Sequence, residues 1–250
     1  MSPVALVTGG TSGIGRACVE RLRDDGYAVA FTGRDAARGA AVAGATGATF
    51  LACDARDRAQ IATSVGAACT FGDGRIDLLV GNAGVLMAGP IAETPLAAFR
   101  ELVEVNLTAL FLYSRACFAL MREQGSGSMV HIASDTGIRG IHELAAYSVT
   151  KAGAVMLSEL FAAEGARHGL RANAVCPGDV EPGVQATPTG HEHDAEDPAG
   201  WDLPPNGRFG TGADVAAAVA WLASSEASHI TGATLRIDGG ANAVLRARIS

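Results

Sequence analysis

TGGTSGIG, residues 8–15, places four glycines within eight positions directly after the apolar run PVALV. Glycine has no Cβ, so a glycine-rich turn can bring its backbone N–H groups very close to another group. Where such a turn joins a strand to a helix, those N–H groups and the helix N-terminus favour a bound phosphate. The stretch therefore predicts a phosphate-binding turn. Its spacing is not G-x-G-x-x-G and it lacks the P-loop lysine, so a turn needed only for helix–sheet packing is the alternative.

Short apolar runs rich in β-forming residues alternate with longer segments of helical periodicity. The expected strands are residues 3–8, 27–32, 48–53, 76–81, 128–133, 170–176 and 233–238. The expected helices are residues 13–25, 35–43, 57–71, 96–122, 146–168 and 213–224. Continuously apolar strands are typical of parallel sheets buried on both faces. The pattern predicts one α/β domain over residues 1–250, a doubly wound parallel sheet of seven strands flanked by helices.

Composition narrows the classes of protein to which the chain can belong. It has 250 residues, of which 48% are hydrophobic and 18% charged, which indicates an ordinary globular protein. A net charge of −7 argues against nucleic acid as a partner. The five cysteines are scattered through apolar runs, so we expect reduced core residues and neither disulfides nor a metal cluster. No stretch reads as a targeting signal or a membrane span, so we expect a cytoplasmic protein with no membrane partner.

One interval, residues 179–210, shows no sustained periodicity and is rich in proline, glycine and acids. A loop of this length in a compact domain is either functional or mobile. Between Asp179 and Asp202 it carries seven acidic residues and no lysine or arginine. That charge fits a solvated mobile loop, or a loop that disfavours anionic substrates or accepts a cationic group. The run His191-Glu192-His193-Asp194 lacks further ligands nearby, so we expect no metal site there.

Several motifs together give a resemblance to a known family. The pattern Thr8-Gly9-x-x-x-Gly13-x-Gly15 resembles the cofactor signature of the classical short-chain dehydrogenase/reductase family. Further matching elements follow in the family's order: Asp54, Asn82-Ala83-Gly84, Asn106, Ser134, Tyr147, Lys151 and Pro177-Gly178. The resemblance runs from Val4 to Gly240, and it implies that the segment after Pro177-Gly178, at about 179–210, is a substrate lid. It implies a Rossmann-like fold and a nicotinamide dinucleotide bound by Gly9, Thr11, Ser12, Gly13, Ile14, Gly15, Asp54, Asn82, Ala83, Gly84, Tyr147, Lys151, Pro177, Gly178 and Val180, with Asp54 toward the adenine.

Tyr147 and Lys151 are the central catalytic candidates. Four residues apart on a helix, their side chains share one face, so the ammonium can stabilise the phenolate and lower the tyrosine pKa from about 10. Such a tyrosine can give a proton to a carbonyl oxygen or take one from an alcohol. Ser134 follows the fifth strand, where ligands of parallel sheets bind, and its hydroxyl can orient the substrate oxygen. The resemblance implies that Lys151 also bonds the nicotinamide ribose and that Asn106 holds a water in a proton relay.

The choice of nicotinamide depends on the end of the second strand, Phe31-Thr32-Gly33-Arg34-Asp35. An acid there would bond the ribose 2′-hydroxyl, whereas an arginine favours a 2′-phosphate. Gly33 stands near the acidic position and Arg34 follows it, so the sequence favours NADP(H). NAD(H) stays possible because Asp35 is either the N-cap of the next helix or an acid near the ribose.

These observations predict an oxidoreductase that transfers a hydride between NADP(H) and a small ketone or alcohol, most simply a ketoreductase. The alternatives are an NAD-dependent alcohol dehydrogenase and a non-catalytic dinucleotide-binding regulatory protein. A third alternative, a ketoreductase for carrier-bound substrates, is disfavoured because residues 124–128, Gln-Gly-Ser-Gly-Ser, lack the basic side chains such members use for docking. The resemblance also implies a homotetramer or homodimer formed through the helices expected at 96–122 and 146–168.

Overall fold

The computed structural model describes residues 2–181 and 203–243. The central part of the predicted lid, including His191 to Asp194, lies outside these described residues.

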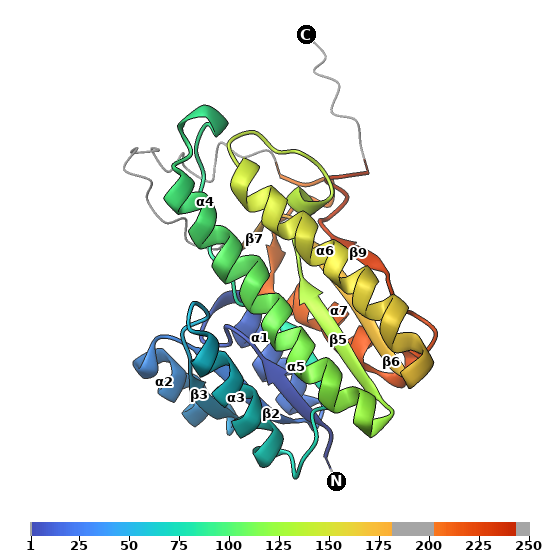
Figure 1. The fold of residues 1–250 in the computed structure, drawn as a ribbon. Helices are drawn as coiled ribbons and strands as arrows, with labels where there is room; N and C mark the ends of the chain where they lie inside the picture. The colour runs from blue at the N-terminus through green and yellow to red at the C-terminus, as the bar shows by residue number, and fades with distance from the viewer. Residues whose placement is uncertain (1, 182–202, 244–250) are drawn as a thin grey trace.

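The centre of the fold is a parallel sheet of seven strands (Figure 1). The strands are β1 (Val4–Val7), β2 (Ala28–Gly33), β3 (Thr49–Ala52), β4 (Leu78–Gly81), β5 (Gly127–Ile132), β6 (Leu170–Pro177) and β9 (Thr234–Ile237). Their order across the sheet is β3-β2-β1-β4-β5-β6-β9. The order reverses between β1 and β4, and in such sheets ligands bind beyond the carboxyl ends at this switch point. The predicted doubly wound sheet is confirmed, with every strand boundary within two residues of its expected position.

Seven α-helices lie among the described residues. They are α1 (Gly13–Asp24), α2 (Ala36–Thr46), α3 (Arg58–Phe71), α4 (Leu96–Val103), α5 (Ala109–Gln124), α6 (Ala145–Gly165) and α7 (Gly212–Ala223). Side chains cap several of them at the N-terminus: Asp35 accepts from a backbone N–H of α2, Asp57 from two of α3, and Thr211 with Asp214 forms a capping box on α7.

The helices form two layers on the sheet. Val7 and Phe31 point to the layer of α1, α2 and α7, whereas Leu6 and Leu79 point to the layer of α3, α5 and α6. Successive residues of a strand face opposite sides, so both faces are covered and β1 is buried along its length. This double coverage explains why the strands read as continuous apolar runs.

The helix expected at 96–122 is interrupted. A π-helical turn, η2 (Glu104–Thr108), separates α4 from α5 and contains Asn106. The run Leu96–Gln124 is long and apolar enough by composition to cross a membrane. A stretch of 18 residues within it has a mean hydropathy of 1.3, but 44% of that stretch is buried inside the protein. Its apolar character is therefore explained in part by packing on α3, α6 and the sheet.

The two ends of the predicted lid lie side by side. Short strands β7 (Val180–Glu181) and β8 (Gly210–Thr211) pair in parallel, and the Gly210 N–H donates to the Asp179 carbonyl at 2.9 Å. Both ends are thereby fixed beyond the carboxyl end of β6.

Candidate active site

The glycine-rich turn after β1 approaches the end of β4 very closely. Gly9 and Gly13 have φ angles of +69° and +51°, which glycine adopts without strain. A Cβ on Gly9 would lie 2.9 Å from the Ala83 Cα, and a Cβ on Gly15 would overlap the Gly9 carbonyl oxygen. The glycines are therefore required by backbone contact as well as by any ligand.

Asn82 holds this turn in place. Its Nδ2 donates to the carbonyl oxygens of Thr8 and Gly9, both at 3.0 Å. The backbone N–H groups of Asn82 and Ala83 in turn donate to the Thr8 hydroxyl at 2.9 and 3.0 Å. The structure thus joins two motifs that are more than 70 residues apart in sequence.

The start of α1 fits a dinucleotide pyrophosphate. Ser12 is the N-cap, yet its side chain makes no capping hydrogen bond, and the first turn carries no acidic residue. The first N–H groups of α1 are thus left without a side-chain cap at the sheet's switch point. A helix N-terminus in this condition favours an anion.

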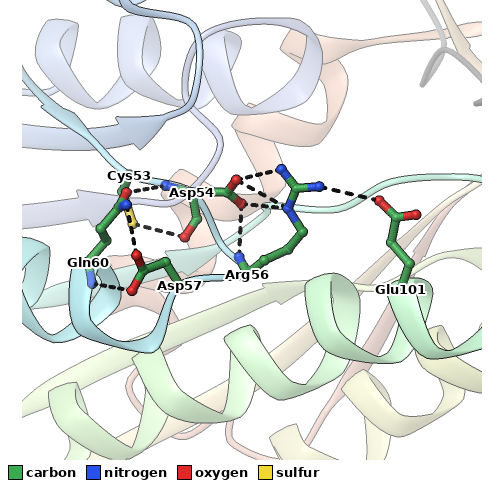
Figure 2. Close-up of polar contacts among 6 residues, drawn as sticks. All are labelled: Cys53, Asp54, Arg56, Asp57, Gln60 and Glu101. Atoms are coloured by element: carbon green, nitrogen blue, oxygen red, sulfur yellow. Dashed lines mark hydrogen bonds and ion pairs between the residues drawn. The ribbon is translucent and has the colours of Figure 1, made fainter.

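Three charged side chains lie at the expected adenosine end, after β2 and β3. Arg56 donates hydrogen bonds to the Asp54 carboxylate from Nε at 3.0 and 3.1 Å and from Nη2 at 2.6 Å (Figure 2). The Arg56 Nη1 lies 3.8 Å from the Glu101 carboxylate on α4. These hydrogen bonds from Arg56 hold the pKa of Asp54 at about 2, and the charge of Arg34 acts in the same direction. Sequence reasoning missed Arg56, although its spacing of two residues from Asp54 was visible.

Ser134, Tyr147 and Lys151 are brought together in the interior. Ser134 caps the short 3-10 helix η3 (Asp135–Gly137) after β5, and the other two lie one turn apart on α6. Their exposed fractions are 8%, 7% and 5%. The Lys151 Nζ donates to the Ile132 carbonyl at 2.8 Å and lies 5.6 Å from the centre of the Tyr147 ring.

The electrostatics differ from the sequence-based expectation that Lys151 lowers the pKa of Tyr147. Burial raises the Tyr147 pKa to about 12, a hydrogen bond with Ser134 opposes the rise, and the charge of Asp135 adds to it. Burial also lowers the Lys151 pKa to about 8, and its ammonium is directed to a backbone carbonyl. Desolvation is therefore the main influence on the pKa values of both side chains.

Asn106 lies close to Lys151 but is occupied by structural hydrogen bonds. Its Nδ2 donates to the Val85 carbonyl at 2.9 Å and to the Thr150 hydroxyl at 3.1 Å, and its Oδ1 accepts from the Val85 N–H at 2.8 Å. A Cβ on Gly84 would lie 3.3 Å from the Asn106 Oδ1 and 3.6 Å from the Lys151 Nζ. The two side chains thus converge on Gly84, and the relay role of Asn106 stays a prediction.

A hollow adjoins Ala146, the residue that precedes Tyr147 on α6. Residues 87–90 and 93–95 line it together with Glu143 and Ala146. The Gly89 N–H donates to the Glu143 carbonyl at 2.8 Å, and Glu143 has a φ of +61°, which is strained for a residue with a side chain. Backbone strain of this kind concentrates at functional sites.

The remaining predicted residues also reach this edge of the sheet. Pro177 ends β6, the Gly178 N–H donates to the Ile237 carbonyl at 3.0 Å, and Val180 begins the paired base of the lid. All five cysteines are free. Within residues 2–181 and 203–243, no group of three His, Cys, Asp or Glu side chains could hold a metal ion.

Comparisons with known proteins agree with this geometry. A family model described as enoyl-(acyl carrier protein) reductase matches residues 9–242. Levodione reductase of Leifsonia aquatica is 36% identical over 96% of this chain and 94% of its own length. A 2,5-dichloro-2,5-cyclohexadiene-1,4-diol dehydrogenase of Sphingobium indicum is 35% identical over 96% of each chain. The crystal structure of a 3-ketoacyl-(acyl-carrier-protein) reductase from Brucella melitensis, complexed with NADH, superposes with a TM-score of 0.87 at 31% identity, covering 96% of this chain and 98% of that one.

One assignment follows from the site and from the extent of these similarities. Asn82 holds the glycine turn in place, and Ser134, Tyr147 and Lys151 are buried together. The chain belongs to the classical short-chain dehydrogenase/reductase family and is an NAD(P)-dependent oxidoreductase.

Proposed function

We propose that the protein is an NADPH-preferring reductase of small ketones, able to oxidise the corresponding alcohols in reverse. One observation carries the proposal: a buried phenol, hydroxyl and ammonium meet at the edge of the sheet that holds the glycine turn. Relatives named for ring-bearing substrates, such as the cyclohexadiene-diol dehydrogenase, direct the first trials to cyclic ketones and secondary alcohols.

The raised pKa of Tyr147 keeps the phenol in the protonated form that carbonyl reduction needs. At neutral pH the phenol keeps its proton, so it can protonate a carbonyl oxygen that the Ser134 hydroxyl orients. A nicotinamide bound here would supply or accept the hydride, and its oxidised ring would add a positive charge that helps to stabilise a phenolate. Alcohol oxidation needs the phenolate, so we expect it to be favoured at higher pH.

The NADP(H) preference is supported by how two neighbouring charges are used. Asp35 accepts the Arg38 N–H at 3.0 Å and pairs with the Arg38 guanidinium at 3.2 Å, so its carboxylate serves as the cap of α2. Arg34 is exposed and makes no ion pair within the part of the chain that the structure describes. An uncommitted guanidinium beyond β2 is suited to a 2′-phosphate. NAD(H) stays the alternative, since the Brucella reductase was crystallised with NADH.

A panel of cyclic ketones and alcohols, assayed with NADPH and NADH by nicotinamide absorbance, tests the function. In a Tyr147→Phe variant we expect turnover to fall about 10²- to 10⁴-fold, because the proton donor is lost. Binding of NADPH, followed by its fluorescence, should be retained. A variant that turns over at the native rate would contradict the role of Tyr147. A native protein that binds dinucleotide but reduces nothing would favour the regulatory alternative.

We also propose that two copies associate through α5 and α6, which lie side by side on the outer layer (Figure 1). Phe111, Met156 and Leu160 are 40%, 52% and 52% exposed on these helices. Phe111 and Met156 line an apolar hollow to which Leu107 and Leu157 also contribute. Adjoining exposed apolar side chains of this size are typical of a protein interface.

A further inference from the structure

Asp135 is a buried carboxylate that the proposed chemistry does not use. It follows Ser134 directly and is only 8% exposed. Its Oδ1 accepts the Ser134 hydroxyl at 3.2 Å, while its Oδ2 accepts from Arg139 Nη2 at 3.2 Å and from Asn242 Nδ2 at 3.4 Å. Burying a carboxylate is costly unless it is paired. The three hydrogen bonds to Asp135 offset that cost, and they point to a role for this residue.

The contact with Asn242 brings a distant part of the chain to the site. Asn242 is fixed by Asp238, whose Oδ2 accepts its backbone N–H at 3.0 Å and its Nδ2 at 2.7 Å. The Gly239 carbonyl accepts the Asn206 N–H at 3.1 Å. This hydrogen bond joins the C-terminal turn, residues 238–243, to the end of the predicted lid. The C-terminal turn is therefore anchored on one side to β9 and to the end of the lid, and on the other side to Asp135.

We propose that Asp135 is a positioning residue: its carboxylate holds the C-terminal turn against the Ser134 loop and places a negative charge beside Tyr147. The inference rests on the proposed function, because it concerns how Ser134 and Tyr147 are held for proton transfer.

Among the described residues, two groups of the loop after β5 act on the Tyr147 phenol: the Ser134 hydroxyl through a hydrogen bond, and Asp135 through its charge. Lys151 lies one turn along the same helix, with its Nζ 5.6 Å from the centre of the Tyr147 ring. The apolar residues Val85, Leu86, Met87, Phe99 and Leu102 pack in one cluster with Tyr147. Burial is the main cause of the raised Tyr147 pKa, and the charge of Asp135 adds to it. Arg139, whose side chain is 46% exposed, pairs with Asp135 at 3.2 Å and so offsets part of that charge.

This arrangement predicts shifts of opposite sign for two variants. Asp135→Asn removes the anion, so the pKa of Tyr147 falls and the pH midpoint of kcat/KM for alcohol oxidation moves lower by about half a unit or more. Arg139→Gln leaves the anion less neutralised, so the midpoint moves higher. Asp73→Asn and Arg122→Gln are matched controls, since each makes the same charge change at an exposed position away from Tyr147. The controls should leave the midpoint in place.

A third variant separates positioning from charge. Asn242→Ala removes the tie to the C-terminal turn but keeps the Asp135 charge, so we expect KM for the alcohol to rise several-fold with the pH midpoint and NADPH affinity unchanged. The proposal is overturned if Asp135→Asn and Arg139→Gln move the midpoint in the same direction or not at all, or if Asn242→Ala leaves KM unchanged. Absence of turnover in the native protein would instead contradict the proposed function.

Discussion

Arg34 and Asp35 are neighbours in sequence, but their charged side chains have different roles. The Asp35 side chain turns back to cap α2, whereas Arg34 stays exposed after β2. Sequence reasoning left both uses of Asp35 open because an N-cap and a ribose ligand need the same short acidic side chain at nearly the same position. Only the direction of the side chain distinguishes them.

At this scale the cofactor preference becomes measurable. In Arg34→Ala we expect the Kd of NADPH to rise about tenfold or more, since a charge-assisted contact with the 2′-phosphate is lost, while the Kd of NADH changes little. Calorimetric titration of both nucleotides checks this. Arg38→Ala removes an equal charge from the same region but one already paired with Asp35, and it should affect the two nucleotides alike. Equal losses in Arg34→Ala would contradict the NADP(H) preference.

The catalytic residues show what a pattern of single residues can and cannot predict. The spacing of Tyr147 and Lys151 fixed their common helix face, and the structure confirms that they lie close together. Their pKa values depend on burial and on the direction of the ammonium, both of which come from distant segments. The contacts of Asp135 with Asn242 and of Arg56 with Glu101 could not be predicted for the same reason, because these residues become neighbours only after folding.

Among the elements, the turn between β1 and α1 is the most tightly constrained. A Cβ on Gly15 would meet both the Gly9 carbonyl and the Asn82 side chain, so the whole turn would have to move. In Gly15→Ala we therefore expect dinucleotide affinity to fall at least about tenfold, measured by NADPH fluorescence. Gly44→Ala is the control, because that glycine lies in α2 with open space around its Cβ position. It should bind normally and be slightly more stable, as expected for alanine within a helix. Equal affinity in both variants would contradict the constraint.

The π turn at η2 is a feature that helical periodicity in the sequence could not predict. One turn of five residues hardly disturbs the spacing of apolar side chains, so the sequence predicted a single helix from 96 to 122. Only the backbone of residues 104–108 reveals the turn, which contains Asn106 with its hydrogen bonds to Val85 and Thr150.

For the whole molecule, the sheet could be predicted because both of its faces are covered, so its strands are mostly apolar. His131 is one of the polar residues buried inside the sheet. It is fully buried in β5, between the hydroxyls of Ser114 on α5 and Ser158 on α6 at 2.9 and 2.8 Å. Burial lowers its pKa from 6.5 to about 4.

The sign of the resulting pH dependence follows directly. Between pH 6.5 and 4 the unfolded chain binds a proton at His131 that the folded protein does not. The free energy of unfolding should therefore decrease by about 3 kcal/mol as the pH falls through this window. Denaturant titrations across that range measure it. His131→Gln should lose this part of the slope, whereas His229→Gln, at an exposed position, should keep it. An unchanged slope in His131→Gln would contradict the assignment.

The proposed association belongs to this scale as well. A charge in the apolar face of α5 and α6, as in Met156→Glu, should reduce the molar mass measured by sedimentation, because burying the charge in an interface is costly. Trp221→Glu places the same charge on α7 in the opposite layer, where Trp221 is 39% exposed, and should leave the mass unchanged. A native protein that sediments as a monomer would refute the association.

The pairing of β7 with β8 has a consequence for how such a protein can change during evolution. Since the chain leaves and re-enters at adjacent points, closing the loop between them costs little more when residues are added. We therefore expect insertions there to leave the sheet and the glycine turn in place. If the segment is the substrate lid that the sequence predicts, its exchange would give new substrate preferences while the hydride chemistry is retained.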